Sequence, residues 1–515
     1  MPNFDAPLGV SVGLSYVAGA LRRAGHEVAA LHITELLGYP WDLERVLADV
    51  QSHAPGLVGI STGFNHYAEM GALAEAIETR LHVPVVLGGV HPTLQSATVM
   101  AQNPHLSYVA VGEGEDKLTA LADALQSGGD TTSIPGLHAR VDGAVKRNPV
   151  RGFVDLATLA PMANDIWDFQ RVADMRRGWV NVSSQRGCPY RCTYCHNNGE
   201  AKLYAAERGV PDNNSWYLRY RPPEAMVEEL RAIRDRWRFQ AFSFIDDTFT
   251  MNPPWLERLL ALYRRDVDMP FICNTTPVDL DEGLVRLLAD SGCRVVRMGV
   301  ESGSARMRAR LLKRPFPEQR IRWAFRETQA RGLHALAFNM IGNVGESQEE
   351  MVETFRFNAD LRPTMMKLAL AYPYPGTEYA DASAGHVDPQ RSTHNFISGS
   401  VLRRSPEDAL WLDKARTFYF WHVNRFLEGE AGRAFAERVE ALEALSAEQW
   451  ADPAVQGALW ASHHALSADL QRRGAFHYTT PFLERTDIIV SSELVASQRE
   501  VIRREAVERE AVEPH

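Results

Sequence analysis

Residues 183–195 read SSQRGCPYRCTYC and place three of the chain's five cysteines, Cys188, Cys192 and Cys195, close together. Proline, arginine and tyrosine stand between them, which predicts a loop and not an apolar core strand. Structural zinc usually takes four protein ligands in paired sets, and no second pair lies nearby. Three thiols suit three corners of a cubane iron–sulfur cluster better, with the fourth iron left without a protein ligand. A zinc ion bound by the three cysteines is the alternative to the iron–sulfur cluster.

The rest of the composition describes a soluble globular protein. Of 515 residues, 45% are hydrophobic and 23% charged, and the net charge is −10. These values exclude wholesale disorder and oppose attraction to nucleic acid or anionic lipid. No apolar run approaches the roughly 18 residues of a membrane span, and the N-terminus lacks a signal-peptide pattern. We therefore expect a cytoplasmic protein with no membrane span, and we expect Cys273 and Cys293 to be buried.

Downstream of the cysteines, apolar strands alternate with amphipathic helices. Strands are predicted at 179–184, 241–245, 271–274, 295–300, 333–341 and 366–372, and helices at 224–238, 255–265, 281–291, 318–331 and 348–361. Helical crossovers imply parallel pairing. Six strands fall short of the eight that close a TIM barrel, so the fold class is α/β with a partial (β/α)6 barrel over residues 176–385.

Polar or glycine-rich clusters follow four of these strands, where parallel barrels carry their chemistry. They are DDTF at 246–249, GVESGS at 299–304, IGNVGE at 341–346 and YPYPGT at 372–377. Together with the cysteine loop they resemble the radical S-adenosylmethionine (SAM) superfamily. The resemblance is to the branch with an N-terminal cobalamin domain, which includes class B methyltransferases and anaerobic Mg-protoporphyrin monomethyl ester cyclase-type proteins.

This resemblance implies a 4Fe-4S cluster on Cys188, Cys192 and Cys195. It also implies SAM contacts at Tyr194, Asp246, Glu301, Ser302, Ile341 and Gly342. One departure is Thr275-Thr276-Pro277, because relatives often carry an arginine after this strand.

Residues 1–130 also alternate, with strands predicted at 27–32, 57–61, 84–88 and 107–111 between helices at 12–24, 42–53 and 67–81. This pattern predicts a doubly wound, Rossmann-like sheet that binds ligands at the carboxyl ends of its strands. Its turns resemble the cobalamin domain of the same branch. The resemblance implies cobalamin contacts at Leu8, Ser61, Thr62, Gly88, Gly89, His91, Pro92, Gly112 and Glu113.

Two features depart from that pattern. No Asp-x-His-x-x-Gly motif occurs, so a histidine ligand below cobalt is not predicted, and we expect His91 to serve the turn instead. The apolar strand expected before Pro7-Leu8-Gly9 is also absent. A start codon assigned too late is favoured over a defective domain.

Two further regions complete the chain. Residues 131–175 form a connector whose Asp142-Gly143 predicts a hairpin. Residues 386–515 are predicted to form a helical cap over the open barrel mouth. Its aromatic stripe, which includes Trp411, Phe418 and Trp421, is expected to be core, and the charged repeat at 503–513 is expected to be a solvated helix.

Taken together, the resemblance implies a cobalamin-dependent radical SAM C-methyltransferase acting on an unactivated carbon of a natural-product-like small molecule. A deoxyadenosyl radical would abstract hydrogen, methylcobalamin would supply the methyl group, and a flavodoxin- or ferredoxin-type donor would supply electrons. One alternative is an oxidative cyclase or ring-rearranging enzyme with the same cofactors. Another, from a different class, is a non-catalytic corrinoid-binding sensor.

Overall fold

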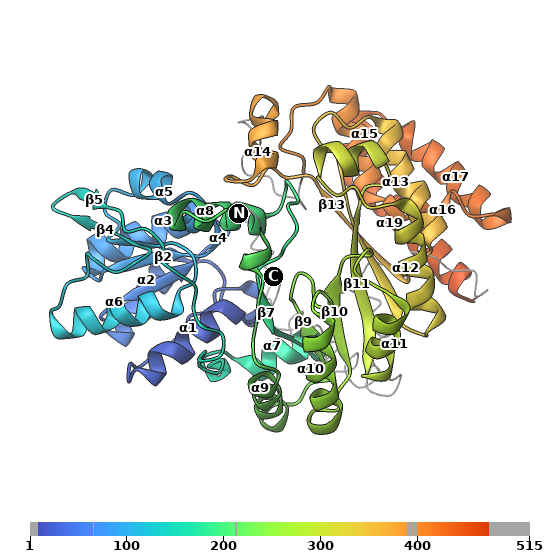
Figure 1. The fold of residues 1–515 in the computed structure, drawn as a ribbon. Coiled ribbons are helices and arrows are strands. Elements are labelled where there is room, and N and C mark those ends of the chain that lie inside the picture. Colours follow the sequence, from blue (N-terminus) through green and yellow to red (C-terminus); the bar gives the residue numbers. More distant parts are fainter. Residues whose placement is uncertain (1–8, 65, 212–213, 389–390, 392–398, 473–515) are drawn as a thin grey trace, which may run out of the picture.

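Two main β-sheets organise the chain. The computed structural model describes residues 9–64, 66–211, 214–388, 391 and 399–472. A five-stranded sheet lies in the N-terminal (blue) part and a six-stranded sheet in the middle of the chain (Figure 1). The helices of the C-terminal (orange to red) part gather beside the second sheet, and every helix of the described ranges is too short or too polar to cross a membrane.

The six-stranded sheet is parallel throughout and has the order β13-β12-β11-β10-β9-β6. Its strands are β6 (Trp179–Val182), β9 (Ala241–Phe244), β10 (Phe271–Thr275), β11 (Cys293–Glu301), β12 (His334–Ile341) and β13 (Met365–Leu370). Since β6 and β13 are both edges, the barrel is open on one side. The predicted partial (β/α)6 barrel is confirmed.

Five helices connect these strands and cover the outer face of the sheet. They are α9 (Pro223–Arg236), α10 (Pro253–Asp266), α11 (Glu282–Asp290), α12 (Glu318–Ala330) and α13 (Gln348–Leu361). The sequence marks their starts: the side chains of Asn252, Asp281 and Ser347 cap α10, α11 and α13. Proline at the start of α9 and α10 needs no backbone donor there.

Alternation along the strands separates two apolar regions. Outward residues such as Phe242, Val296 and Ala337 are buried in the core shared with the helices, and so are Cys273 and Cys293, as predicted. Inward residues near the amino ends form a second cluster, the barrel floor: Trp179, Ile272, Val295, Leu336 and Met365. Most inward residues beyond the floor, such as Asn181, Arg297 and Lys367, keep solvent-accessible surface, so the inner face above it is open.

The N-terminal sheet has the order β1-β2-β3-β4-β5. Strands β1 (Val58–Ser61), β2 (Val85–Gly88) and β3 (Tyr108–Ala110) are parallel, while β4 (Leu137–Val141) and β5 (Ala144–Lys146) form the predicted antiparallel hairpin. Helices α1 (Val12–Arg23) and α6 (Glu115–Ser127) pack together, with α6 on one face of the sheet. The other face is covered by α2 (Leu43–His53), α3 (Tyr67–Ala76, continuing to Leu81) and α5 (Ser96–Gln102). The doubly wound prediction is confirmed.

The strand predicted at 27–32 is wrong. In the described ranges no strand precedes β1, so β1 is an edge strand whose side chains are alternately half-buried and exposed. In a doubly wound sheet the segment 27–32 would pair with a central first strand, and none of the described residues forms that strand. Without that neighbour its backbone has no ladder to join, although Leu31 and Ile33 still pack against the core.

The C-terminal region is helical, as predicted. Its helices are α14 (Glu378–Ser383), α15 (Pro406–Thr417), α16 (Tyr419–Asn424), α17 (Gly429–Glu443), α18 (Ala447–Ala451) and α19 (Pro453–Arg472). Phe418 and Trp421 are fully buried against Phe355 of α13 and Met366 of β13, so the aromatic stripe is core.

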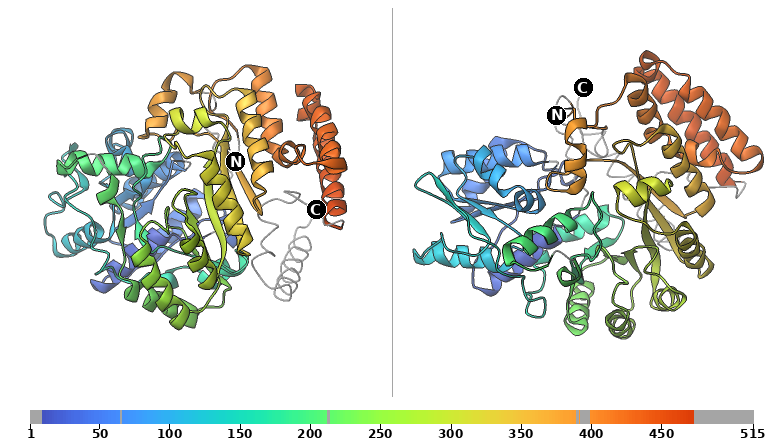
Figure 2. Two further views of the ribbon diagram at one scale, coloured as in Figure 1. Left: turned by 45° about the vertical axis from the view of Figure 1, so that its right-hand side comes forward. Right: turned by 45° about the horizontal axis from the view of Figure 1, so that its top comes forward.

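The predicted place of this region, over the barrel mouth, is wrong for the helices from α15 onward. They pack on the outer face of β12, β13 and α13, because that face offers the apolar surface that the aromatic stripe needs (Figure 2). The charged repeat at 503–513 lies outside the described residues.

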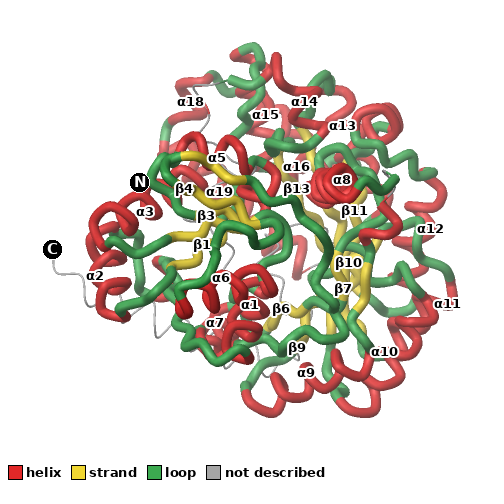
Figure 3. Tube along the Cα trace, turned by 60° about the vertical axis from the view of Figure 1, so that its left-hand side comes forward, coloured by secondary structure: helices red, strands yellow, loops and turns green. Residues whose placement is uncertain are grey.

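Helix α8 (His196–Arg208) links the two sheets. It begins directly after Cys195, yet Ala201 and Tyr204 are buried in the core of the N-terminal sheet, and α8 contacts α4 (Val90–Leu94). Figure 3 shows α8 end-on, in front of the strands of the half-barrel, with the N-terminal sheet to one side. The remaining short elements are α7 (Phe169–Met175), β7 (Gln185–Arg186), β8 (Arg219–Tyr220) and the single turns at 35–37, 164–166, 214–217, 307–311 and 384–386.

Candidate active site

The cysteine loop leaves the carboxyl end of β6 and is fixed on both sides. Gln185 and Arg186 pair with β8. The Thr193 hydroxyl donates to Leu311 O at 2.6 Å, and Thr193 O accepts from Tyr379 N at 3.0 Å. Cys188 and Cys192 are buried and Cys195 is half-buried. The chain therefore holds all three thiols in place from neighbouring elements.

The three thiols share one buried region next to Asp247. Burial is the main cause that raises the pKa of Cys188, and it raises the pKa of Cys195 to about 12. The charge of Asp247 and the charges of the other thiols act in the same direction, which shows that these groups are neighbours.

This donor set fits a cubane cluster. Within the described ranges, no three His, Cys, Asp or Glu side chains are grouped to hold a metal ion. Zinc thiolates all lie about 2.3 Å from one ion, whereas each thiolate of a cubane binds a different iron. Three cysteines at this spacing, with no second cysteine pair nearby in the sequence, suit the second arrangement.

The two aspartates after β9 have different roles. Asp246 is buried and accepts from Ser184 N (2.8 Å), Gln185 N (2.9 Å) and the hydroxyls of Ser183 and Ser184. It therefore anchors the start of the cysteine loop. Asp247, which the sequence prediction passed over, accepts from Asn197 Nδ2 at 2.9 Å and keeps exposed surface beside the thiols. Burial raises the pKa of Asp247.

Arg314 connects the cysteine loop with β11 and was not predicted. It is buried, and its guanidinium donates to Cys192 Sγ at 3.4 Å and to Gly299 O at 3.0 Å. Its charge also acts on Tyr194 and Glu301. No sequence motif marks this arginine; it follows a π-helical turn at 307–311 that returns the chain to the site.

Glu301 is held in a strained backbone conformation. Its φ is +69°, which costs a residue with a side chain roughly 1–3 kcal/mol. A Cβ on Gly299 would lie 2.2 Å from Glu301 Oε1, so the Glu301 carboxylate folds back against Gly299. Burial raises the pKa of Glu301, while Arg314 and a hydrogen bond from Tyr194 oppose that rise. Predicted SAM residues Tyr194 and Glu301 are thus brought together.

The other predicted SAM residues contribute mainly backbone. Ser302 is buried, and its hydroxyl accepts from Ser304 N at 3.1 Å. The Ile341 side chain belongs to the outer core, and its carbonyl accepts from Ala371 N. Gly342 has a φ of +76°. These positions lie at the carboxyl ends of β11 and β12, beside the cysteine loop.

Glu346 closes the loop after β12 and carries a testable pH dependence. It accepts from Asn343 N at 2.8 Å, and burial raises its pKa from 4.5 to about 7. Between these values the folded protein binds more protons than the unfolded chain, so this group's contribution to stability falls as pH rises, by about 3 kcal/mol at most. Anaerobic thermal unfolding measures this effect. We expect the unfolding temperature of Glu346→Gln to rise relative to that of the wild type as pH increases from 5 to 7.5. If the difference between the two unfolding temperatures does not change with pH, this assignment is refuted.

Gly187 sets the approach to Cys188. Its φ is +86°, and a Cβ there would lie 2.2 Å from the backbone oxygen of Tyr217. We expect Gly187→Ala to lower the free energy of unfolding and the iron content of reconstituted protein. Gly209→Ala is the matched control, since Gly209 has a φ of +63° but no atom within 4 Å of the added carbon. The clash should add about 1–3 kcal/mol beyond the control; equal effects of the two variants would contradict this account.

Part of the predicted cobalamin set lies at the carboxyl ends of β1 and β2. Ser61 is exposed, and the buried Thr62 donates its backbone N–H to Gly88 O at 2.9 Å. Gly89 has a φ of +99°, and a Cβ there would lie 2.6 Å from Thr62 O. His91 and Pro92 are buried in α4.

His91 does not project into open space. Its ring lies 4.1 Å from that of Tyr67 and 5.2 Å from that of Phe64, measured between centroids, and neither nitrogen has a hydrogen-bond partner among the described residues. Burial lowers the pKa of His91. Leu8 lies outside the described residues.

Gly112 and Glu113 face the half-barrel instead. A Cβ on Gly112 would lie 2.1 Å from the Tyr204 hydroxyl of α8. Glu113 forms ion pairs with Arg219 at 2.5 Å and with Arg186 at 3.2 Å. Burial alone would raise the pKa of Glu113, but the two arginines outweigh it and lower the pKa. The structure thus uses this turn to join the N-terminal domain to the cysteine loop.

The carboxyl ends of both sheets meet. The rings of Phe64, after β1, and Tyr374, after β13, have centroids 4.9 Å apart. A Cβ on Gly376 would touch Leu94 of α4 at 2.8 Å. The strand ends of the N-terminal domain therefore lie next to the mouth of the half-barrel, so groups bound at the two edges would face one another.

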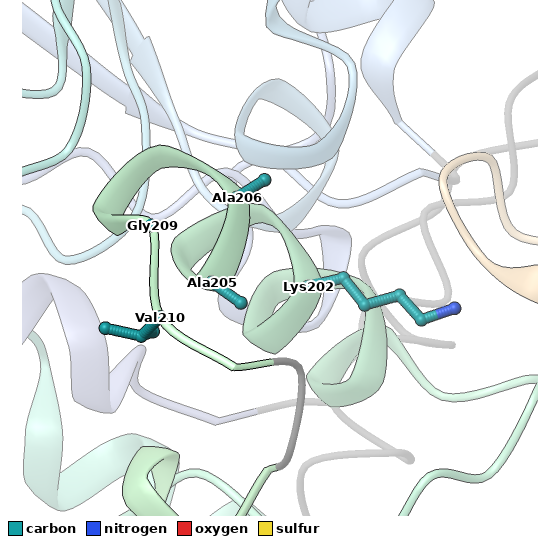
Figure 4. A pocket seen from close by; sticks show the side chains of 5 residues that line it. All are labelled: Lys202, Ala205, Ala206, Gly209 and Val210. Carbon is teal, nitrogen blue, oxygen red and sulfur yellow. The ribbon is translucent and has the colours of Figure 1, made fainter.

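A hollow of about 520 Å³ lies elsewhere, along the carboxyl-terminal half of α8 (Figure 4). Its lining is Lys202, Ala205, Ala206, Gly209 and Val210. The one titratable group there, the Lys202 ammonium, is paired with Glu378. The hollow contains no group that could carry the chemistry of the cysteine loop.

Two family models match the chain: the radical SAM superfamily over residues 182–357 and the B12 binding domain over residues 7–122. The chain is 28% identical to the uncharacterized methyltransferase PH0819 of Pyrococcus horikoshii, over 73% of this chain and 79% of that protein. It is 23% identical to cytidylyl-2-hydroxyethylphosphonate methyltransferase of Streptomyces wedmorensis, over 80% of this chain and 84% of that protein.

Solved structures share the fold. The radical SAM methyltransferase TsrM from Kitasatospora setae, solved with cobalamin and a [4Fe-4S] cluster, aligns with a TM-score of 0.61 at 19% identity, over 97% of this chain and 98% of that chain. The cobalamin-dependent radical enzyme OxsB aligns with a TM-score of 0.62 at 13% identity, over 100% of this chain and 80% of that chain. With its cysteine loop, half-barrel and N-terminal sheet in place, the chain belongs to the radical SAM superfamily, in the branch that carries an N-terminal B12-binding domain.

Proposed function

We propose that this protein is a cobalamin-dependent radical SAM C-methyltransferase that methylates an unactivated carbon of a small molecule. One observation carries the proposal: a buried loop offers three thiols and lies where the strand ends of the B12-binding domain meet the barrel mouth. The methyltransferase relatives match over most of their length, which supports transfer of a methyl group as the outcome.

Each side of the site has a task. Cys188, Cys192 and Cys195 would hold the cluster, and Tyr194 and Glu301, with the backbone after β12, would contact SAM. When bound, cluster and SAM supply a radical that takes hydrogen from carbon, and cobalamin carries the methyl group. Arg314 holds a positive charge beside Cys192 and Glu301. The packed junction at Glu113 and Tyr204 would keep water out.

A methyl-labelled SAM experiment tests the proposal without a known substrate. Reconstituted holoenzyme with reduced cobalamin is incubated anaerobically with SAM carrying a ¹³C methyl group, and the corrinoid is then analysed by mass spectrometry. We expect the label on cobalamin, and no labelled corrinoid when the N-terminal domain is left unloaded. Unlabelled cobalamin in the loaded enzyme would refute methyl transfer.

An oxidative cyclase is the second candidate. The anaerobic magnesium-protoporphyrin IX monomethyl ester cyclase of Rubrivivax gelatinosus is 23% identical over 81% of this chain and 74% of that protein. Such an enzyme would cleave SAM without passing its methyl group to cobalamin, so the same experiment separates the two.

The proposal also includes the type of electron donor and the cellular location of the reaction. A flavodoxin- or ferredoxin-type protein would reduce the cluster, and the reaction would take place in the cytoplasm without a nucleic-acid partner. The net charge of −10 supports the last point, because it disfavours binding to a polyanion.

A further inference from the structure

The inner face of the half-barrel carries a polar layer directly above the apolar floor. One inward-facing position beyond the floor, the strands present Asn181, Ser243, Asn274, Arg297, Phe338 and Lys367. Strand register places Asn181 beside Ser243, Asn274 beside Arg297, and Phe338 beside Lys367. The layer therefore contains two cations on strands that are separated by β12.

Three cations meet at this layer. Arg297 donates to the Ser243 hydroxyl and to Phe244 O, both at 3.0 Å, and its Nε has no partner. Arg176, at the end of α7, donates to Asn181 Oδ1 at 2.9 Å. Lys367 is exposed and makes no hydrogen bond or ion pair with any residue in the described ranges.

No carboxylate of the described residues balances these charges. Burial, and then the charge of Arg176, lower the pKa of Arg297 to about 10, although Cys273 and Cys293 oppose this. Burial and the charge of Arg297 lower the pKa of Lys367. Arg297 is therefore repelled by Arg176 and by Lys367.

Two other arginines of the chain are paired with acids. Arg221 forms an ion pair with Glu229 at 3.0 Å, and Arg186 pairs with Glu113 and Glu115. Buried charges are ordinarily paired or bind an ion, because desolvation without a counter-charge is expensive.

The buried Arg308 has no ion pair either, but it donates to the backbone oxygens of Ser302 and Gly303. Arg297 differs from these arginines because it lies near two further cations on the open inner face of the half-barrel. An anionic ligand would balance these charges.

A ligand can reach this layer from the mouth. Arg297 and Asn181 are half-buried, Lys367 is exposed, and Ile245, at the mouth, is 39% exposed. Glu301 lies four positions beyond Arg297 on β11, roughly 13 Å at the usual rise along a strand. A molecule anchored at the layer could therefore present a carbon near the predicted SAM residues if it is roughly 10 Å long.

We propose that Arg297, Lys367 and Arg176 bind the anionic end, a carboxylate or a phosphate-type group, of the small molecule that this enzyme methylates. This assignment rests on the proposed function. Arginine suits such a group because its guanidinium matches two acceptor oxygens at once. Under this assignment the substrate is an organic anion, and the carbon that is methylated lies several bonds from the anionic group.

Calorimetric titration of reconstituted holoenzyme with inorganic pyrophosphate and with malonate tests the site. We expect at least one of these anions to bind the wild type with one-to-one stoichiometry, and to bind Lys367→Gln on the order of tenfold more weakly. Lys367→Arg should stay within about threefold of the wild type, because it keeps the charge. Lys146→Gln, at an exposed lysine of β5, is the control and should bind as the wild type does.

Two results would overturn the assignment: neither anion binds the wild type, or Lys367→Gln binds both as the wild type does. A SAM titration shows whether the cations bind an anionic group of the substrate or the carboxylate of SAM. Unchanged SAM affinity in Lys367→Gln supports a substrate site, whereas an equal loss of SAM affinity would mean that the cations hold the SAM carboxylate, which also overturns it. Anion binding requires no turnover. The titration can therefore be interpreted even if the enzyme fails to transfer a methyl group to cobalamin.

Discussion

Cys192→Ala should abolish SAM cleavage. We expect the rate of deoxyadenosine formation to fall by roughly a thousandfold or more, which corresponds to an increase of about 4 kcal/mol in the activation free energy of SAM cleavage. Cys192 is buried between Arg314 and the other two thiols, and no fourth cysteine stands near enough to replace it. The measurement is deoxyadenosine released by dithionite-reduced, reconstituted protein, together with iron per chain.

Cys273→Ala is the matched control. Cys273 is also fully buried, but it points into the core between the sheet and its helices. Its loss should leave iron content and cleavage near wild-type levels at a small cost in stability. If Cys192→Ala cleaved SAM as fast as the wild type, the cluster would have no place in the mechanism and the corrinoid-sensor alternative would gain support.

Arg314→Gln should have the second-largest effect. The change removes the cation that donates to Cys192 Sγ and Gly299 O and that offsets the buried charge of Glu301. Removing one partner of a buried charge pair costs about 3–5 kcal/mol, so we expect a lower free energy of unfolding and at least about tenfold weaker SAM binding. Without the cation the pKa of Glu301, which burial already raises, should rise further.

Arg306→Gln provides the comparison for Arg314. Arg306 pairs with Glu350 at 2.5 Å, but its side chain is half exposed, and solvent screening makes such surface pairs weak. SAM affinity, measured by equilibrium dialysis, should be unchanged in this variant. Arg314→Lys should restore part of the affinity because it keeps the charge. Equal SAM affinities for Arg314→Gln and the wild type would show that the buried guanidinium does not support the SAM site.

The sequence predicts most of the architecture because its local signals agree. The barrel strands are apolar runs that alternate with amphipathic helices, and side chains such as Asp281 and Ser347 cap three of these helices, so local pattern and global fold point the same way. The cysteine loop is predictable for a related reason: its ligands lie within one short segment, and their spacing is visible without tertiary information.

The rest depends on contacts between distant segments. Helix α8 looks like part of the barrel in sequence order, yet Ala201 and Tyr204 complete the core of the other sheet. Arg314 reaches Cys192 across 122 positions of sequence. The cations Arg297 and Lys367 face the same interior only because the folded sheet places β11 and β13 on either side of β12. At residues 27–32 the local pattern predicts a strand that does not form, because no strand of the described residues lies beside it to pair with.

Electron–nuclear double resonance on the reduced, reconstituted protein tests the central claim most directly, with SAM labelled by ¹⁵N in its amino group and ¹⁷O in its carboxylate. The account predicts hyperfine coupling from both labels, because the iron that Cys188, Cys192 and Cys195 leave free would bind these two groups. A cluster that shows no coupling to either label, or a metal analysis that finds zinc in place of iron and sulfide, would contradict it.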